Sequence, residues 1–195
     1  MMGWAPTPLF RIEGRMYNRA SRGVLPLAAA SSVFTGYTTV MLLLEQRMRR
    51  SGGPGIIPFE LAGNAIRADE IMAQWGSDGQ RAARISLWLD FGYMLSYGAL
   101  TALLLDRVRH VHGHRSAVSA VVIPAVAADA VEGVTLLKVL KRSDVAVNTR
   151  RARNAAMVKF AILGCALGYC VIGSAMAASG KAFGVGRPSK IRARS

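Results

Sequence analysis

Four long apolar stretches constrain the fold of this chain more than any other feature of its sequence. Each stretch has about the 20 residues that an α-helix needs to cross the hydrocarbon core of a bilayer. Charged residues lie almost wholly between the stretches. The stretches occupy residues 24–44, 85–105, 116–140 and 155–178. We therefore predict an all-α, polytopic membrane protein whose four transmembrane helices form an antiparallel bundle.

Two other interpretations of these stretches are less favoured. The first stretch follows basic residues, as the apolar region of a signal peptide does, but it is longer than such a region and more basic residues follow it. We interpret it as a retained span. A soluble bundle with buried central helices would also be apolar, but it gives no reason for four stretches of bilayer length.

The charge of the chain points to a membrane rather than to nucleic acid. The sequence holds 25 Lys and Arg against 11 Asp and Glu, for a net charge of +14 over 195 residues. A basic excess of this size is typical of nucleic-acid-binding proteins. Here, however, the arginines flank the apolar stretches, where they meet anionic lipid headgroups. We expect the lipid bilayer as a partner and no nucleic acid.

The chain divides into three parts around this membrane domain. Residues 1–23 form a polar, basic N-terminal segment, residues 24–178 form the membrane domain, and residues 179–195 form a basic tail that is predicted to be disordered. Lys and Arg are shared almost equally between the two sides, so the positive-inside rule gives no clear orientation. We favour a multi-pass protein of the cell (inner) membrane with both termini in the cytoplasm, because the long first loop dilutes its arginines.

The loop between the first two spans contains a predicted short amphipathic helix. Asn64 is suited to cap its start and Gly76 to end it. Its apolar side chains share one side at helical spacing, which indicates a helix on the membrane surface or packed over the bundle. These side chains belong to Ala65, Ala68, Ile71, Met72 and Trp75. Further along, Pro124 predicts a kink in the third span.

Ionisable residues inside the spans need an explanation, because each costs roughly 2.5–3.5 kcal/mol at a helix centre. The candidates are Asp90, Asp129, Glu132 and Lys159, whereas Lys138 lies near a span end from which it can reach the headgroups. Antiparallel topology places Asp90, Glu132 and Lys159 in the same half of the membrane. Asp129 and Glu132 project within about 60° of each other on one helix. We therefore predict an intramembrane polar cluster.

Each span also carries a polar stripe that we expect to face the bundle interior. These stripes are Ser31, Ser32, Thr35, Thr38 and Thr39 in the first span, Ser86, Asp90, Tyr93, Tyr97 and Thr101 in the second, and Lys159, Cys170 and Ser174 in the fourth.

The cluster has a structural and a functional interpretation. In the structural one, Lys159 pairs with Asp90 or Glu132 and the network fixes the register of the helices. In the functional one, the cluster binds a cation, a proton or a lipid headgroup. Three acids against one lysine leave an excess of negative charge, so a proton or a cation must offset it.

A stripe of small residues lies opposite Lys159 on the fourth span. It consists of Ala161, Gly164, Gly168 and Ala175 and includes a GxxxG motif. Small residues allow two helices to approach closely. The stripe is therefore a candidate interface with a partner helix, either in another protein or on a neighbouring span of the same bundle.

Motifs of catalysis and cofactor binding are missing from the sequence. No nucleophile with a paired base lies in the spans, and no phosphate-binding glycine motif is present. His110, His112 and His114 lack a fourth ligand nearby, which favours solvated histidines over a metal site. Cys165 and Cys170 point to different sides of a helix. We expect no enzyme activity, no metal and no cofactor.

Several short motifs resemble those of a group of bacterial proteins. They are Phe59-Glu60-Leu61-Ala62-Gly63, Arg67-Ala68, Glu70-Ile71, Trp75-Gly76 and Leu89-Asp90-Phe91. Over residues 24–178 the chain resembles small, uncharacterised bacterial four-span integral membrane proteins. In general character it is also similar to accessory subunits of MCE-type lipid-uptake transporters.

This resemblance assigns no activity and no catalytic residues. From the small-residue stripe, the small mass outside the membrane and the missing catalytic motifs, we expect a non-enzymatic accessory or stabilising subunit of a larger integral membrane complex, of the kind that transports lipids. The alternative is a small proton- or cation-coupled membrane transporter that uses its intramembrane carboxylates.

Overall fold

The structure is a computed structural model that describes the backbone of residues 8–182 and the side chains of residues 24–179. All regular structure in the described part is helical. The elements are α1 (Pro8–Arg50), α2 (Ile56–Glu60), α3 (Ala65–His112), α4 (Ala117–Ala120), α5 (Val122–Leu140) and α6 (Val145–Ala182). Four regions are long and apolar enough to cross a membrane, namely Val24–Arg50, Ala65–His112, Ala117–Leu140 and Val145–Ser179. The prediction of an all-α, four-span membrane fold is confirmed.

The helices run beyond the predicted spans. Helix α1 is continuous from Pro8, so it includes most of the predicted N-terminal segment, 1–23. Helix α6 continues to Ala182 and therefore takes in the first residues of the predicted basic tail. The remainder of that tail, 183–195, lies outside the described residues.

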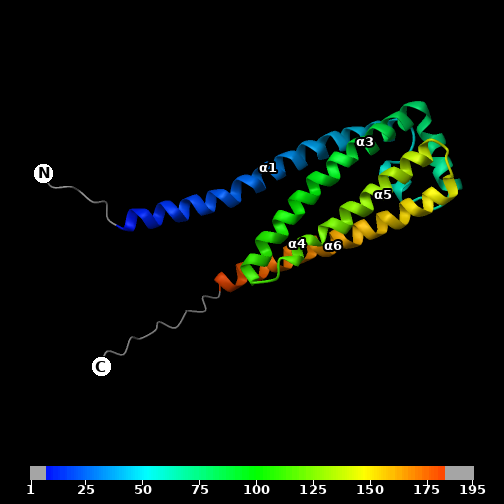
Figure 1. The fold of residues 1–195 in the computed structure, drawn as a ribbon. Coiled ribbons are helices and arrows are strands. Elements are labelled where there is room, and N and C mark those ends of the chain that lie inside the picture. The colour runs from blue at the N-terminus through cyan, green and yellow to red at the C-terminus, as the bar shows by residue number, and fades with distance from the viewer. Residues whose placement is uncertain (1–7, 183–195) are drawn as a thin grey trace, which may run out of the picture.

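Helix α3 lies at the centre of the arrangement. It packs against α1, α5 and α6, and α5 packs along α6. Helices α1 and α6 form the two outer edges in Figure 1, with α3 and α5 between them. Helix α1 packs principally against α3. Only 6% of the most apolar 18-residue stretch of its span is buried, compared with 44% of the corresponding stretch in the span Ala117–Leu140. The bundle is therefore open along one side of α1.

The predicted amphipathic helix is the first part of α3 and packs over the end of the bundle. Asn64 caps it by accepting a hydrogen bond from the backbone N–H of Arg67 at 2.8 Å. Gly76 interrupts it with a φ of 57° and a ψ of −161°. Its side chains at 68, 71, 72 and 75 are buried in a core that also includes Leu136 and Val139. Of the two predicted placements, the structure shows packing over the bundle.

The break expected near Pro124 lies three residues before it. Val121 separates α4 from α5, and Pro124 falls in the first turn of α5. A proline fits that position because the first N–H groups of a helix have no partner within the helix.

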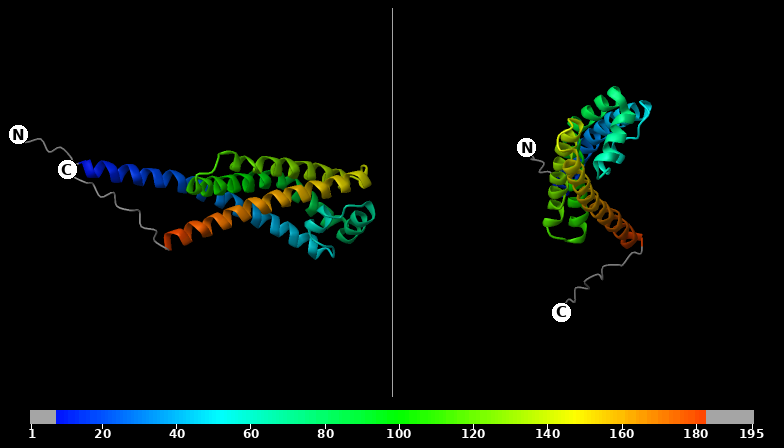
Figure 2. Two further views of the ribbon diagram at one scale, coloured as in Figure 1. Left: turned by 90° about the horizontal axis from the view of Figure 1, so that it is seen from below. Right: turned by 90° about the vertical axis from the view of Figure 1, so that its right-hand side faces the viewer.

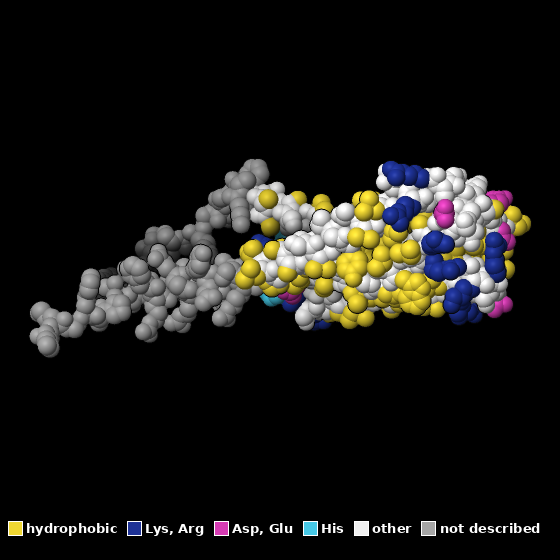
Figure 3. Space-filling view, turned by 90° about the horizontal axis from the view of Figure 1, so that it is seen from above, with side chains coloured by type: hydrophobic (Ala, Val, Ile, Leu, Met, Phe, Trp, Pro, Cys, Tyr) yellow, Lys and Arg dark blue, Asp and Glu magenta, His cyan; other side chains and the backbone are white. Residues whose placement is uncertain are grey.

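The surface of the described helices has an apolar belt and a basic end. Figure 2 shows the long helices running side by side, and Figure 3 shows apolar side chains along their length. Lys and Arg gather at the end that carries the loops after α1 and α5. Arg47, Arg50, Arg81, Arg84 and Arg142 are exposed there. This distribution suits helices whose ends meet lipid headgroups.

Candidate functional site

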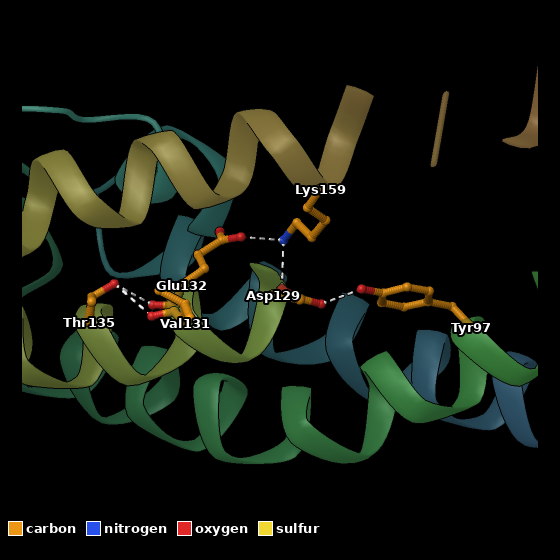
Figure 4. A network of polar contacts seen from close by, with 6 residues as sticks. All are labelled: Tyr97, Asp129, Val131, Glu132, Thr135 and Lys159. Carbon is orange, nitrogen blue, oxygen red and sulfur yellow. Dashed lines mark hydrogen bonds and ion pairs between the residues drawn. The ribbon is translucent and has the colours of Figure 1, made fainter. Parts of the chain in front are cut away.

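Lys159 is the centre of a buried ion-pair network between α5 and α6. Its Nζ lies 2.9 Å from Oδ1 of Asp129 and 2.7 Å from Oε2 of Glu132 (Figure 4). The hydroxyl of Tyr97, on α3, donates a hydrogen bond of 2.6 Å to Oδ2 of Asp129. Asp129, Glu132 and Lys159 are 2%, 1% and 7% exposed. Three of the four predicted cluster residues are thus in direct contact.

The two acids bind Lys159 differently. Nζ donates a hydrogen bond to Asp129, whereas its contact with Glu132 is an ion pair that lacks the alignment of a hydrogen bond. Neither carboxylate oxygen of Glu132 accepts a hydrogen bond from a described residue. Two acids therefore share one positive charge, and one of them keeps unused acceptor capacity.

Asp90 lies beside this network without an ion pair of its own among the described residues. Asp90 lines the same cleft as Asp129 and Lys159, and the charges of both act on its carboxyl group. The structural interpretation paired Lys159 with Asp90 or Glu132, and the structure gives it Glu132 and Asp129. The reason is the spacing on α5, where positions 129 and 132 share the helix face that packs on α6.

Glu60 is a member of the cluster that the sequence analysis missed. It is the last residue of α2, is 9% exposed, and interacts with Glu132 and with the charge of Lys159. Burial raises the pKa of the Glu60 carboxyl above its ordinary value, and the positive charge of Lys159 opposes that rise. Glu60 was missed because it lies outside the predicted spans, in the connection between the first two. The available signal was its position between two apolar side chains, Phe59 and Leu61.

The cluster holds more negative than positive groups. Four carboxyl groups, from Glu60, Asp90, Asp129 and Glu132, surround the single ammonium of Lys159. Uncompensated carboxylates are costly away from water. Bound protons or a bound cation must therefore offset the excess.

The cluster borders a cleft of about 550 Å³ between α1 and α6. Helix α3 forms its floor, and all five residues of the polar stripe predicted on the second span line it. The lining includes Thr38, Met41 and Glu45 of α1, Ile56, Ile57 and Glu60 of α2, Ser86, Asp90, Tyr93, Tyr97 and Thr101 of α3, Asp129 of α5, and Lys159, Phe160 and Leu163 of α6. The cleft is the place where an outside molecule can reach the cluster.

The polar stripe predicted on the first span is only partly turned inward, which corrects that expectation. Thr38 lines the cleft, but Ser32, Thr35 and Thr39 are exposed. The hydroxyl of Thr39 donates to the backbone carbonyl of Thr35 at 2.9 Å. A hydroxyl bonded to its own helix in this way needs no partner from a neighbouring helix, so it tolerates a lipid-facing position. On the fourth span, Ser174 is likewise exposed, whereas Lys159 and Cys170 are buried.

The small-residue stripe of α6 faces away from the other described helices. Ala161, Gly164 and Ala175 are exposed and Gly168 is half-buried. No atom of another described helix lies within 4 Å of the position that a Cβ would take on Gly164 or Gly168. By contrast, Gly173 packs closely against Val108 of α3. The predicted stripe is therefore available to something outside the described chain.

The three histidines near the end of α3 bond to neighbouring groups. His112 Nε2 lies 2.8 Å from the backbone oxygen of Gly173, and His114 Nδ1 lies 2.6 Å from the hydroxyl of Tyr169. His110 Nδ1 contacts the backbone oxygen of Asp106. Two of the three thus tie α3 and the residues after it to α6, where solvated histidines were expected. Among the side chains of residues 24–179, the structure shows no group of His, Cys, Asp and Glu arranged to hold a metal ion.

Comparison of the chain with protein-family models, with curated proteins and with solved structures finds no match.

Proposed function

We propose that the protein is a small proton- or cation-coupled membrane carrier whose coupling site is the acidic cluster. The observation that carries this proposal is the charge imbalance at the cleft, where four carboxyl groups surround one lysine within apolar helices. Intramembrane acids that face a cavity are typical of proton and ion pathways.

The arrangement separates a fixed part from an exchangeable part. Asp129 and Glu132 are held by Lys159, and Tyr97 fixes the orientation of Asp129. Glu60 and Asp90 have no ion pair among the described residues and line the cleft. We assign the exchangeable proton or cation to these two acids, because neutralising them leaves the Lys159 network intact.

Infrared difference spectroscopy on the purified protein tests this assignment directly. A protonated carboxylic acid has a carbonyl stretching band that a carboxylate lacks. We expect such a band to fall as pH rises and to respond to exchange of Na⁺ for a large inert cation. Glu60→Gln and Asp90→Asn should each remove part of the signal.

Glu70→Gln is the matched control, because Glu70 is an exposed acid that pairs with Arg67 outside the cleft. It should leave the infrared signal unchanged. The carrier proposal would be contradicted if the protein stays folded and none of the cluster carboxyl groups titrates or responds to cations. If the Glu132→Gln protein simply fails to accumulate, the role of Glu132 is to stabilise the fold.

The stripe on α6 favours a second candidate function, that of an accessory subunit of a larger membrane complex such as a lipid transporter. Gly164 and Gly168 present open helix backbone, and α1 packs principally on one neighbour. Close helix packing is the main source of association between helices in lipid. Both features leave room for a partner helix.

Affinity purification in mild detergent, followed by mass spectrometry, tests this second candidate. We expect a co-purifying membrane protein that is lost in Gly164→Leu, where the larger side chain blocks close approach. Ala99→Leu is the matched control, since Ala99 is an exposed small residue on α3. Recovery of the protein alone would count against the accessory role.

A further inference from the structure

The cleft changes in polarity along its length. One end is lined by acids, namely Glu45, Glu60, Asp90 and Asp129. The described residues at the other end carry apolar groups and one hydroxyl; they are Leu100, Thr101, Leu104, Leu163 and Leu167. From Ser86 to Leu104 along α3 the lining extends over roughly 27 Å at 1.5 Å per residue. A site with one charged end and one long apolar end has the shape of an amphiphile.

The charged end selects for a cationic head group. Among the described residues, Lys159 is the only basic one that lines the cleft, and its charge is already shared by Asp129 and Glu132. No arginine of the basic end lines the cleft, so a phosphate group would meet only Lys159, whose charge two acids already share. The occupant therefore carries positive charge and lacks a phosphate.

Glu60 gives a second, independent indication of a ligand at this end. Its side chain lines the cleft and is more than nine-tenths buried, yet it makes no ion pair with a described residue. A buried carboxylate gains most from a donor that brings both charge and N–H groups. A primary ammonium has three such donors and can contact Glu60 and Asp90 together, whereas a quaternary ammonium has none.

Aromatic rings line the middle of the cleft, between its two ends. Phe34 of α1 stacks on Tyr93 of α3 with ring centroids 5.5 Å apart, and Tyr93 meets Tyr97 edge-on at 5.8 Å. All three side chains line the cleft. Such rings offer apolar area to an alkyl chain and favour a nearby cation.

We propose that the cleft binds a membrane-dissolved amphiphile with a primary ammonium head group and no phosphate. The head group contacts Glu60 and Asp90, and the apolar chain runs past Tyr93 toward Leu104 and Leu167. The molecule enters sideways from the lipid between α1 and α6. This inference rests on the proposed cation-binding function and names the chemical class of its cation.

Headgroup chemistry, rather than chain length, decides this binding. The alkyl chain leaves one apolar environment for another, so it gains little by moving from lipid into the cleft. An amine and an alcohol with the same chain should therefore differ strongly, because only the amine compensates the buried carboxylates. This contrast defines the test.

Native mass spectrometry of the full-length protein, released from maltoside micelles, measures the occupant. The probes are octadecylamine, octadecanol and octadecyltrimethylammonium. We expect a one-to-one adduct with octadecylamine and none with the other two. Glu60→Gln and Asp90→Asn should each weaken amine binding about tenfold or more, as loss of a charged hydrogen-bond partner does. Glu70→Gln should bind as the unmodified chain does.

A third variant keeps the inference testable if the acid variants fold poorly. Leu167→Trp fills the apolar end at a half-exposed position. The bulk of the new side chain should exclude the long alkyl chain and so weaken octadecylamine binding, while a short-chain amine, which does not reach position 167, stays bound. Equal binding of the alcohol or of the trimethylammonium probe, or unchanged amine binding in Glu60→Gln and Asp90→Asn, would overturn the inference.

The outcomes for the ligand and for the proposed function are separable. If the infrared carboxyl signal responds to protons and Na⁺ but octadecylamine does not bind, the ligand class is wrong and the carrier proposal stands. If neither response occurs, both are wrong.

Discussion

At the scale of single residues, Lys159 decides whether the acidic cluster stabilises or destabilises the fold. It is 7% exposed and holds Asp129 and Glu132 at 2.9 and 2.7 Å. A buried ion pair adds little net stability when complete, but removing one partner leaves the other charge unpaired.

Replacing this lysine should therefore be severe. We expect Lys159→Met to lower the free energy of unfolding by roughly 3–5 kcal/mol, because two buried acids lose their cation. Thermal unfolding in detergent, followed by circular dichroism, measures the change. Lys138→Met is the control, since Lys138 is exposed on α5, and it should have little effect. A similar small loss for both variants would contradict the expectation that Asp129 and Glu132 depend on the charge of Lys159.

The pH dependence of stability at Glu60 follows from the direction of its pKa shift. Burial raises the pKa of Glu60 above its ordinary value of 4.5. As pH rises past that value, the unfolded chain releases the Glu60 proton while the folded protein keeps it. The folded state then binds more protons, so stability falls with rising pH until the folded protein also releases the proton.

Glu60→Gln should flatten that fall. Unfolding temperatures measured from acidic to neutral pH should decline less steeply for Glu60→Gln than for the unmodified chain. Glu70→Gln should keep the original slope, because Glu70 is half-exposed. Parallel curves for the unmodified chain and Glu60→Gln would contradict a protonated Glu60 in the folded state.

At the scale of helices, α3 combines a surface-packed segment and a membrane span around one glycine. Gly76 has a φ of 57° and a ψ of −161°, a conformation that is essentially restricted to glycine. The break lets Trp75 enter the core with Phe59 while the rest of α3 continues through the bundle. The conformation of one residue thus positions the segment that packs over the end of the bundle.

A side chain at this break should be costly although there is room for it. No atom lies within 4 Å of a Cβ on Gly76, so the penalty of Gly76→Ala comes from the backbone alone. We expect a loss of roughly 1–3 kcal/mol in unfolding free energy. Gly164→Ala is the matched control, because Gly164 is helical and equally open, and it should be neutral or slightly stabilising. Equal effects would show that the segment adjusts around position 76.

The positions of the helices could be predicted from the sequence, whereas the contacts between segments could be predicted only in part. The spans follow from apolar length and from charges at their ends, and Asn64 and Gly76 mark the loop helix by local chemistry. The pairing of Lys159 with Asp129 depends on how α5 and α6 rotate against each other. Glu60 joins the cluster only because α2 folds back over the bundle, which no periodicity within the loop encodes.

At the scale of the whole molecule, the apolar belt and the basic end place the cluster within the membrane, below the headgroups. Trp88 is 62% exposed one turn after Arg84, whereas Trp75 is 1% exposed in the core over the bundle end. The two tryptophans therefore report on different environments. Their contrast can be measured without knowledge of the ligand.

Phospholipids with bromine on the acyl chain should quench Trp88 strongly and Trp75 weakly. The measurement uses reconstituted protein with Trp4→Phe as background, together with Trp75→Phe or Trp88→Phe to leave one tryptophan at a time. Bromine quenches at contact, so the difference follows from exposure to lipid chains. Equal quenching of both would contradict the placement of α3 in the membrane.

The attachment of α1 mainly to α3 has a consequence for the response of the protein to lipid composition. A span held along one side can change its tilt at small cost, and bilayer thickness is one of the forces that set tilt. Because α1 forms one wall of the cleft, a thicker or thinner bilayer would alter the width of that opening before it disturbed the packing of α3, α5 and α6. Membrane thickness would then act on this protein as a mechanical input, separate from any chemical ligand.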